Sequence, residues 1–167
     1  NIDCVHGHFL VCKYALYRWN PKTKFITWMR DPVERLASHY YYWKRVYDPK
    51  TAQPLHRKVI EENWSLERFS LGPELKNTFC QFTWGFPFER FDFIGLAEHY
   101  EEDLAFFARE YLGSDLPVHE KNVMPGDRGE IHIGDPKFRA TIEKHHAKDM
   151  LLYREAREKR LTRTIWL

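Results

Sequence analysis

The stretch KFITWMRDPVERLASHYYYW, residues 24–43, decides much of the expected fold. Its first six residues are a short apolar run, which is typical of a buried strand. Asp31, Pro32 and Glu34 then form a helix start, with an N-cap, a first-turn proline and the last residue of a D-x-x-E capping box. The sequence therefore predicts a strand over 24–29 that leads directly into a helix over 32–46.

This helix has one apolar side, which we expect to pack on the sheet. At about 100° per residue, that side comprises Val33, Leu36, Ala37, Tyr40 and Trp43. Ser38 falls on the opposite side, and Arg30 stands at the carboxyl end of the strand, where open α/β sheets bind ligands. A guanidinium, a helix N-terminus and a hydroxyl together suit a phosphate. The alternative is a surface arginine paired with Asp31 or Glu34, beside a solvated serine.

Composition bounds the class of protein. The chain has 167 residues, of which 43 % are hydrophobic and 16 % aromatic, and this predicts one packed domain over 1–167. The 26 basic and 24 acidic residues nearly balance, which argues against a general nucleic-acid-binding protein. No apolar run has the length of a membrane span, and Cys4, Cys12 and Cys80 form no disulfide framework. We expect these cysteines to be free thiols.

Strands and helices alternate along the rest of the chain. A second strand is predicted over 91–96, and a long loop, a candidate lid, over 113–134. Further helices are predicted over 55–62, 65–71, 73–83, 99–112 (ending at Gly113) and 136–161. This pattern is typical of an α/β layered fold with a mainly parallel sheet. So few strands, and a first residue other than Met, lead us to expect an N-terminally incomplete domain.

A histidine pair precedes these elements in the segment CVHGHF. In an extended chain His6 and His8 would share a face, so they could be two metal ligands, although no third ligand has matching spacing. One buried and one surface histidine is the simpler reading. A general base is the third, because imidazole titrates near neutrality. The residues alone leave these readings open.

The segment RDPVERLASHYYYW resembles the 3′-phosphate-binding element of sulfotransferases that use 3′-phosphoadenosine 5′-phosphosulfate (PAPS). It is most similar to the heparan sulfate (uronosyl) 2-O-sulfotransferase group. The resemblance implies a three-layer, P-loop-NTPase-like fold. It also implies PAPS as co-substrate, 3′-phosphoadenosine 5′-phosphate (PAP) as product, and no metal. It also implies that Arg30 and Ser38 bind the 3′-phosphate.

The same resemblance extends to the H-G-H segment. It implies that His8 is the general base for a sugar hydroxyl and that His6 is a supporting residue near the acceptor. Asn77 in PELKNTFCQF resembles a family position near the active site. By position in the expected loop, Lys121, Asn122 and Arg128 are candidates for contacts to the nucleotide; the candidates for an acidic glycan acceptor are Arg18, Lys44 and Arg45.

One family element is missing from the chain. The superfamily binds the 5′-phosphosulfate with a Gly/Thr-rich loop that carries a lysine, and no such run precedes His6; PKTK at 21–24 comes in the wrong order. We therefore expect either a fragment of a complete enzyme or a degenerate relative. The alternatives are a non-catalytic nucleotide- or glycan-binding relative and a small-molecule kinase. A kinase would need a GxxxxGK[ST] motif, which this sequence does not contain. The expected compartment is the cytoplasm in a bacterium and the Golgi lumen in an animal; oligomeric state is not predicted.

Overall fold

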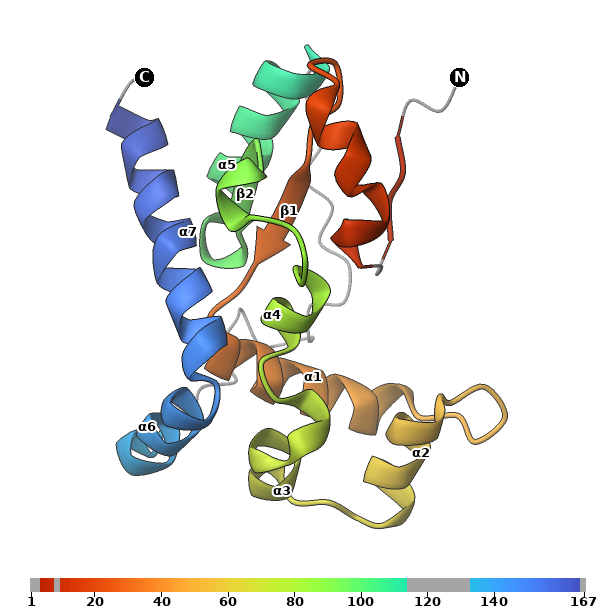
Figure 1. The fold of residues 1–167 in the computed structure, drawn as a ribbon. Coiled ribbons are helices and arrows are strands. Elements are labelled where there is room, and N and C mark those ends of the chain that lie inside the picture. Colours follow the sequence, from red (N-terminus) through yellow and green to blue (C-terminus); the bar gives the residue numbers. More distant parts are fainter. Residues whose placement is uncertain (1–3, 8–9, 114–132, 166–167) are drawn as a thin grey trace.

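The structure is a computed structural model, and it describes residues 4–7, 10–113 and 133–165. Within these ranges the chain is α/β and mostly helical, with one small parallel sheet (Figure 1). The sheet pairs β1 (Ile26–Met29) with β2 (Phe93–Leu96). Both predicted strands are therefore confirmed, although each is shorter than its apolar run.

The sheet has its own apolar core. α5 (Tyr100–Phe107) and α7 (Ala147–Ile165) both contact β2, and η1 (Val11–Trp19) lies on the other side of β1 (Figure 1). The buried cluster here comprises Met29, Phe86, Phe88, Phe91, Ile94, Leu96, Tyr153 and Ala156. Burial of this apolar area is the main force that joins the sheet to α7.

A second core lies among the helices below the sheet in Figure 1. α1 (Pro32–Val46) contacts α2 (Pro54–Glu61), α3 (Leu66–Leu71) and α6 (Pro136–His145). Its buried cluster comprises Val33, Leu36, Tyr40, Val59, Trp64, Phe69, Leu75 and Ile142. The predicted apolar side of α1 is indeed buried, but it packs on helices and not on the sheet. Periodicity identifies the buried side of a helix, and it does not identify what covers that side.

Two predicted helices are interrupted. The helix expected over 73–83 is a short turn, η2 (Pro73–Leu75), followed by α4 (Thr78–Phe82), and Asn77 between them has a left-handed backbone with φ 51°. The helix expected over 136–161 breaks at His146 into α6 and α7. Both breaks meet at one junction, which is described below.

The remaining helical segment is nearly as expected. η4 (Ala97–His99) leads into α5, which continues into a π-helical turn, η5 (Ala108–Leu112). The segment ends at Gly113, whose φ of 64° is the left-handed conformation that glycine adopts easily. The predicted end of this helix is thus confirmed.

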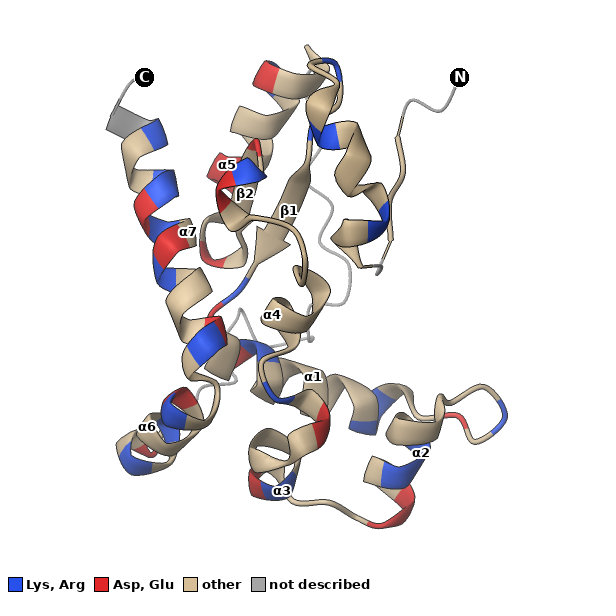
Figure 2. Ribbon diagram, viewed as in Figure 1, with Lys and Arg blue, Asp and Glu red and all other residues tan. Residues whose placement is uncertain are grey.

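Charged residues are spread over the surface rather than gathered by sign (Figure 2). α7 carries both signs along its length, whereas η1 carries basic residues and no acidic ones. Among the helices that the structure describes, none is both long enough and apolar enough to cross a membrane.

Candidate functional site

The carboxyl ends of the two strands meet at one edge of the sheet. Because the strands are parallel, Arg30 after β1 and Glu98 after β2 lie at this same edge. The two ends are tied together, since the backbone N–H of Asp31 donates to Oε1 of Glu98 at 2.7 Å. Arg30 thus lies at the carboxyl end of its strand, as the sequence predicted.

The N-terminus of α1 is closed by the chain itself. Oδ1 of Asp31 accepts hydrogen bonds from the N–H groups of Val33 at 2.9 Å and Glu34 at 3.1 Å, so the predicted N-cap is confirmed. The return bond of a capping box would run from the N–H of Asp31 to Glu34, but that N–H bonds to Glu98. These two helix N–H groups are already paired with Asp31 and cannot bind an anion. The expectation that the helix N-terminus offers free N–H groups is therefore wrong for these two.

Arg139 of α6 connects the start of α1 to the rest of the edge. It donates to Oδ2 of Asp31 at 2.6 Å, to Oε1 of Glu34 at 2.7 Å and to Glu143 at 3.0 Å. The charges of Asp31 and Glu34 are thereby compensated by a cation other than Arg30. Sequence reasoning missed Arg139 because it lies 108 residues from Asp31 and belongs to no local motif.

Arg30 and Ser38 are both half-buried. The sequence allowed Arg30 to be a surface arginine paired with Asp31 or Glu34, but in the structure Arg139 takes those carboxylates. Neither Arg30 nor Ser38 forms a hydrogen bond or an ion pair with another side chain in the described part of the chain. From the N-cap, Ser38 lies about 10 Å along the helix axis at 1.5 Å per residue. One phosphate can therefore contact both groups only if the Arg30 side chain extends along α1.

Tyr153 of α7 closes the back of this edge. It is 7 % exposed. Its pKa is raised above the ordinary tyrosine value, chiefly by burial and then by the nearby negative charges of Glu98 and Asp31. The phenol thus keeps its proton at neutral pH and can act only as a neutral hydrogen-bonding group.

The candidate acceptor residues are not brought together. Lys44 and Arg45 lie in the last turn of α1, about 20 Å along the helix axis from its start. Their cations lie over tyrosine rings, Lys44 over Tyr40 at 5.3 Å and Arg45 over Tyr42 at 5.7 Å. Arg18 is in η1, before the amino end of β1. Arg18 therefore lies on a different element from Lys44 and Arg45, and the three cations do not line one site.

The histidine pair and the loop candidates are only partly described. His6 lies in an exposed segment without regular structure. The other candidates, which are His8, Lys121, Asn122 and Arg128, lie outside the described residues. Within the described ranges, no group of three or more His, Cys, Asp or Glu side chains is placed to bind a metal ion.

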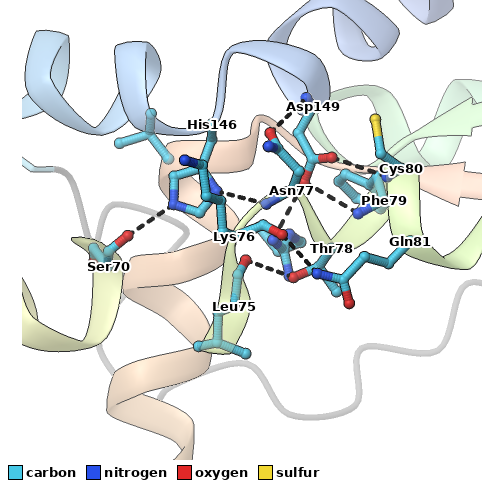
Figure 3. A network of polar contacts seen from close by, with 12 residues as sticks. Ser70, Leu75, Lys76, Asn77, Thr78, Phe79, Cys80, Gln81, His146 and Asp149 are labelled. Carbon is cyan, nitrogen blue, oxygen red and sulfur yellow. Dashed lines mark hydrogen bonds and ion pairs between the residues drawn. The ribbon is translucent and has the colours of Figure 1, made fainter. Parts of the chain in front are cut away.

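Asn77 occupies a helix junction rather than an open site (Figure 3). Its Oδ1 accepts from the N–H of Asp149 at 3.3 Å, and its own N–H donates to Nδ1 of His146 at 3.2 Å. Both carboxylate oxygens of Asp149 accept from α4, from the N–H groups of Phe79 at 3.1 Å and Cys80 at 3.0 Å. The side chain of Asn77 thus joins α4 to α7, and the structure gives no support for the expected contact to an acceptor.

Burial controls the protonation of this junction. Nδ1 of His146 accepts a hydrogen bond, so Nε2 carries the proton and donates to the carbonyl of Ser70 at 2.7 Å. Burial lowers the pKa of His146 below its ordinary value. Arg35 of α1 lies 3.8 Å from the buried carboxylate of Asp149 and is the nearest described cation to it. The junction is therefore a packed, charge-paired connection between helices.

Comparisons with known proteins add no family to this description. No protein-family model matches the chain, and neither a characterised protein nor a solved structure matches it significantly.

Proposed function

We propose that this protein is a PAPS-dependent sulfotransferase, and that the edge formed by Arg30 and Ser38 binds the 3′-phosphate of the nucleotide. One observation supports this most. Arg30 stands at the carboxyl end of a parallel strand, and the carboxylates beside it are paired with Arg139. Among the described residues its guanidinium therefore has no ion-pair partner and can bind a ligand. This is also the segment whose sequence resembles the sulfotransferase 3′-phosphate element.

The described side chains fit such a phosphate. Arg30 supplies a permanent charge with a planar set of donors, and Ser38 supplies a hydroxyl that bonds to no other side chain in the part of the chain that the structure describes. Three carboxylates lie near, but Arg139 compensates Asp31 and Glu34, while Glu98 accepts from a backbone N–H. The edge is therefore not as repulsive to an anion as its acidic residues suggest.

The proposed reaction moves a sulfuryl group from PAPS to a hydroxyl of a carbohydrate or similar acceptor and releases PAP. The hydroxyl oxygen forms a bond to sulfur, the bond from sulfur to the phosphate oxygen breaks, and His8 takes the hydroxyl proton. Arg30 and Ser38 fix the nucleotide so that the attacking and leaving oxygens are in line. His6 supports the acceptor side. No metal takes part in this scheme.

In this proposal the two-stranded sheet belongs to a three-layer, P-loop-NTPase-like sulfotransferase fold. In the sulfotransferase fold a strand, loop and helix hold the 5′-phosphosulfate with backbone N–H groups and a lysine. The proposed partners are the nucleotide and a hydroxylated glycan. The proposed compartment remains the cytoplasm of a bacterium or, for an animal protein, the Golgi lumen.

Calorimetric titration of PAP tests the nucleotide site. We expect Arg30→Ala to weaken PAP binding by about tenfold or more, since a charged hydrogen bond contributes about 1.5–3 kcal/mol. Ser38→Ala should weaken it less. Arg45→Ala is the matched control, because this arginine lies at the far end of the same helix. Adenosine 5′-phosphosulfate, which lacks the 3′-phosphate, should bind wild type and Arg30→Ala equally.

Four outcomes would overturn parts of the proposal. Failure of PAP to bind the wild-type chain would contradict the sulfotransferase assignment. Equal loss in Arg30→Ala and Arg45→Ala would show general charge attraction rather than a site. PAP binding by a protein whose rate of sulfate transfer is unchanged in His8→Ala would contradict the base assignment, and binding without any transfer would favour the non-catalytic relative.

A further inference from the structure

A shallow hollow lies at the amino ends of the two strands, opposite to Arg30. Its volume is about 240 Å³, and its walls come from the end of η1 and from the segments that lead into β1 and β2. Lys24, which lines it, is six residues before Arg30, so the two positions are up to about 20 Å apart at 3.3 Å per residue. The hollow is therefore separate from the proposed nucleotide edge.

Two arginines of the hollow meet on one indole ring. The guanidinium of Arg18 lies 4.8 Å from the ring centre of Trp19, and that of Arg90 lies 5.8 Å from it. Neither arginine forms an ion pair with a carboxylate among the residues that the structure describes. Two like charges held by one ring repel each other, and the cation–π attraction offsets only part of this repulsion. An anion bound between them would reduce it further.

The acidic residues of the hollow do not cancel this charge. Asp92 is already occupied, because it accepts from Nζ of Lys24 at 3.1 Å and from the N–H of Phe25 at 2.9 Å. Glu89 is the second carboxylate of the lining. Lys159 of α7 adds a positive charge near this wall, since its Nζ donates to the backbone carbonyl of Glu89 at 3.1 Å, and the Glu89 carboxylate itself stays one negative charge against the two arginines.

We propose that Arg18 and Arg90 bind the phosphate or sulfate group of a small ligand in this hollow. A tetrahedral dianion can accept hydrogen bonds from both guanidinium groups at once. The volume is below the roughly 300 Å³ at which pockets for whole drug-sized ligands begin, so the hollow suits the anionic group and not a large body. Trp19, 68 % exposed, is a positioning residue that holds the two cations. This site is independent of the proposed sulfotransferase activity.

Calorimetry at low ionic strength with inorganic phosphate, inorganic sulfate and glucose 6-phosphate tests the proposal. We expect Arg18→Gln and Arg90→Gln each to weaken binding about tenfold. Glu89→Gln should strengthen it severalfold, because it removes the repulsive carboxylate. Arg45→Gln, an exposed arginine on another helix, is the matched control and should change nothing.

The relative affinities of the three probes show whether the ligand is an organic ester or a free anion. Tighter binding of glucose 6-phosphate than of inorganic phosphate supports an organic ester as the ligand, and equal binding supports a free anion. Absence of binding of all three probes at millimolar concentration would overturn the proposal. Equal weakening by Arg18→Gln and Arg45→Gln would also overturn it, because it would show general charge attraction.

The proposals for the nucleotide edge and for the hollow can be tested independently. Arg30→Ala should weaken PAP binding at the nucleotide edge by about tenfold or more and leave phosphate binding in the hollow unchanged. Loss of phosphate binding in Arg30→Ala would show that the anion binds at Arg30 and would contradict the hollow. Phosphate binding that survives while PAP does not bind at all would contradict only the sulfotransferase proposal.

Discussion

Asn77 and Asp149 cap each other's helices. The carboxylate of Asp149 in α7 accepts two N–H groups from the first turn of α4, while Oδ1 of Asn77, the N-cap residue of α4, accepts the N–H of Asp149. Helix N-termini usually take such acceptors from their own N-cap residue. Here the acceptors are exchanged between elements 72 residues apart, so the caps also fix how α4 and α7 meet.

Replacement of Asp149 should therefore destabilise the fold strongly. Asp149→Ala leaves two helix N–H groups and the half-buried guanidinium of Arg35 without their partner, and we expect a loss of about 3 kcal/mol in the free energy of unfolding. Asp135→Ala is the matched control. Asp135 is an exposed N-cap that accepts one N–H, so its removal should cost about 1 kcal/mol. Urea denaturation that gives equal losses for both variants would contradict the exchange of caps.

Two histidines should make the protein less stable in mild acid. Burial, followed by the charges of Arg35 and His56, lowers the pKa of His39 from 6.5 to about 4, and burial also lowers that of His146. Because the unfolded chain binds protons more readily, their contribution is complete above pH 6.5 and is lost as pH falls toward 4. For His39 the loss can reach about 3 kcal/mol.

Unfolding by urea at pH 7.5, 5.5 and 4.5 measures this loss. The variant His39→Phe keeps an aromatic side chain beside Trp43 and Phe69 but cannot titrate. Its stability should depend less on pH over this range than that of the wild type. Parallel pH profiles for the two proteins would show that His39 is not responsible.

The sequence predicted what depends on neighbouring residues and missed what depends on distant ones. The N-cap Asp31 and the helix end at Gly113 were predictable because the partners of each lie within one turn. The breaks at Asn77 and His146 were not, since each residue adopts its conformation to bond to the other element. The position of Arg30 at the carboxyl end of β1 was predicted, but the pairing of its neighbours Asp31 and Glu34 with Arg139 was not. Tertiary partners of this kind have no local pattern.

Gly95 should tolerate no side chain. It faces Trp28 across the sheet, and a Cβ atom at Gly95 would lie 2.3 Å from the Trp28 ring. We expect Gly95→Ala to lower the free energy of unfolding by about 1–3 kcal/mol through overpacking. Gly134→Ala is the control, because a Cβ there meets nothing within 4 Å. The smaller ring of Trp28→Phe should recover part of the loss in the double variant, and strictly additive losses would contradict the contact.

Arg139 should link the stability of the α1 start to the proposed nucleotide site. Arg139→Gln removes the guanidinium that pairs with the half-buried Asp31 and the buried Glu34, and we expect a loss of about 1–3 kcal/mol in the free energy of unfolding. Arg109→Gln, which breaks an exposed pair with Glu110, is the control and should cost less than about 1 kcal/mol.

The same variant should weaken PAP binding although Arg139 need not touch the nucleotide. Without it, the negative charges of Asp31 and Glu34 repel a phosphate held by Arg30 and compete for its guanidinium. The additional change Glu34→Gln removes one of these charges and should restore part of the affinity. Calorimetry that finds equal PAP affinity in wild type and Arg139→Gln would show that Arg30 does not depend on this compensation.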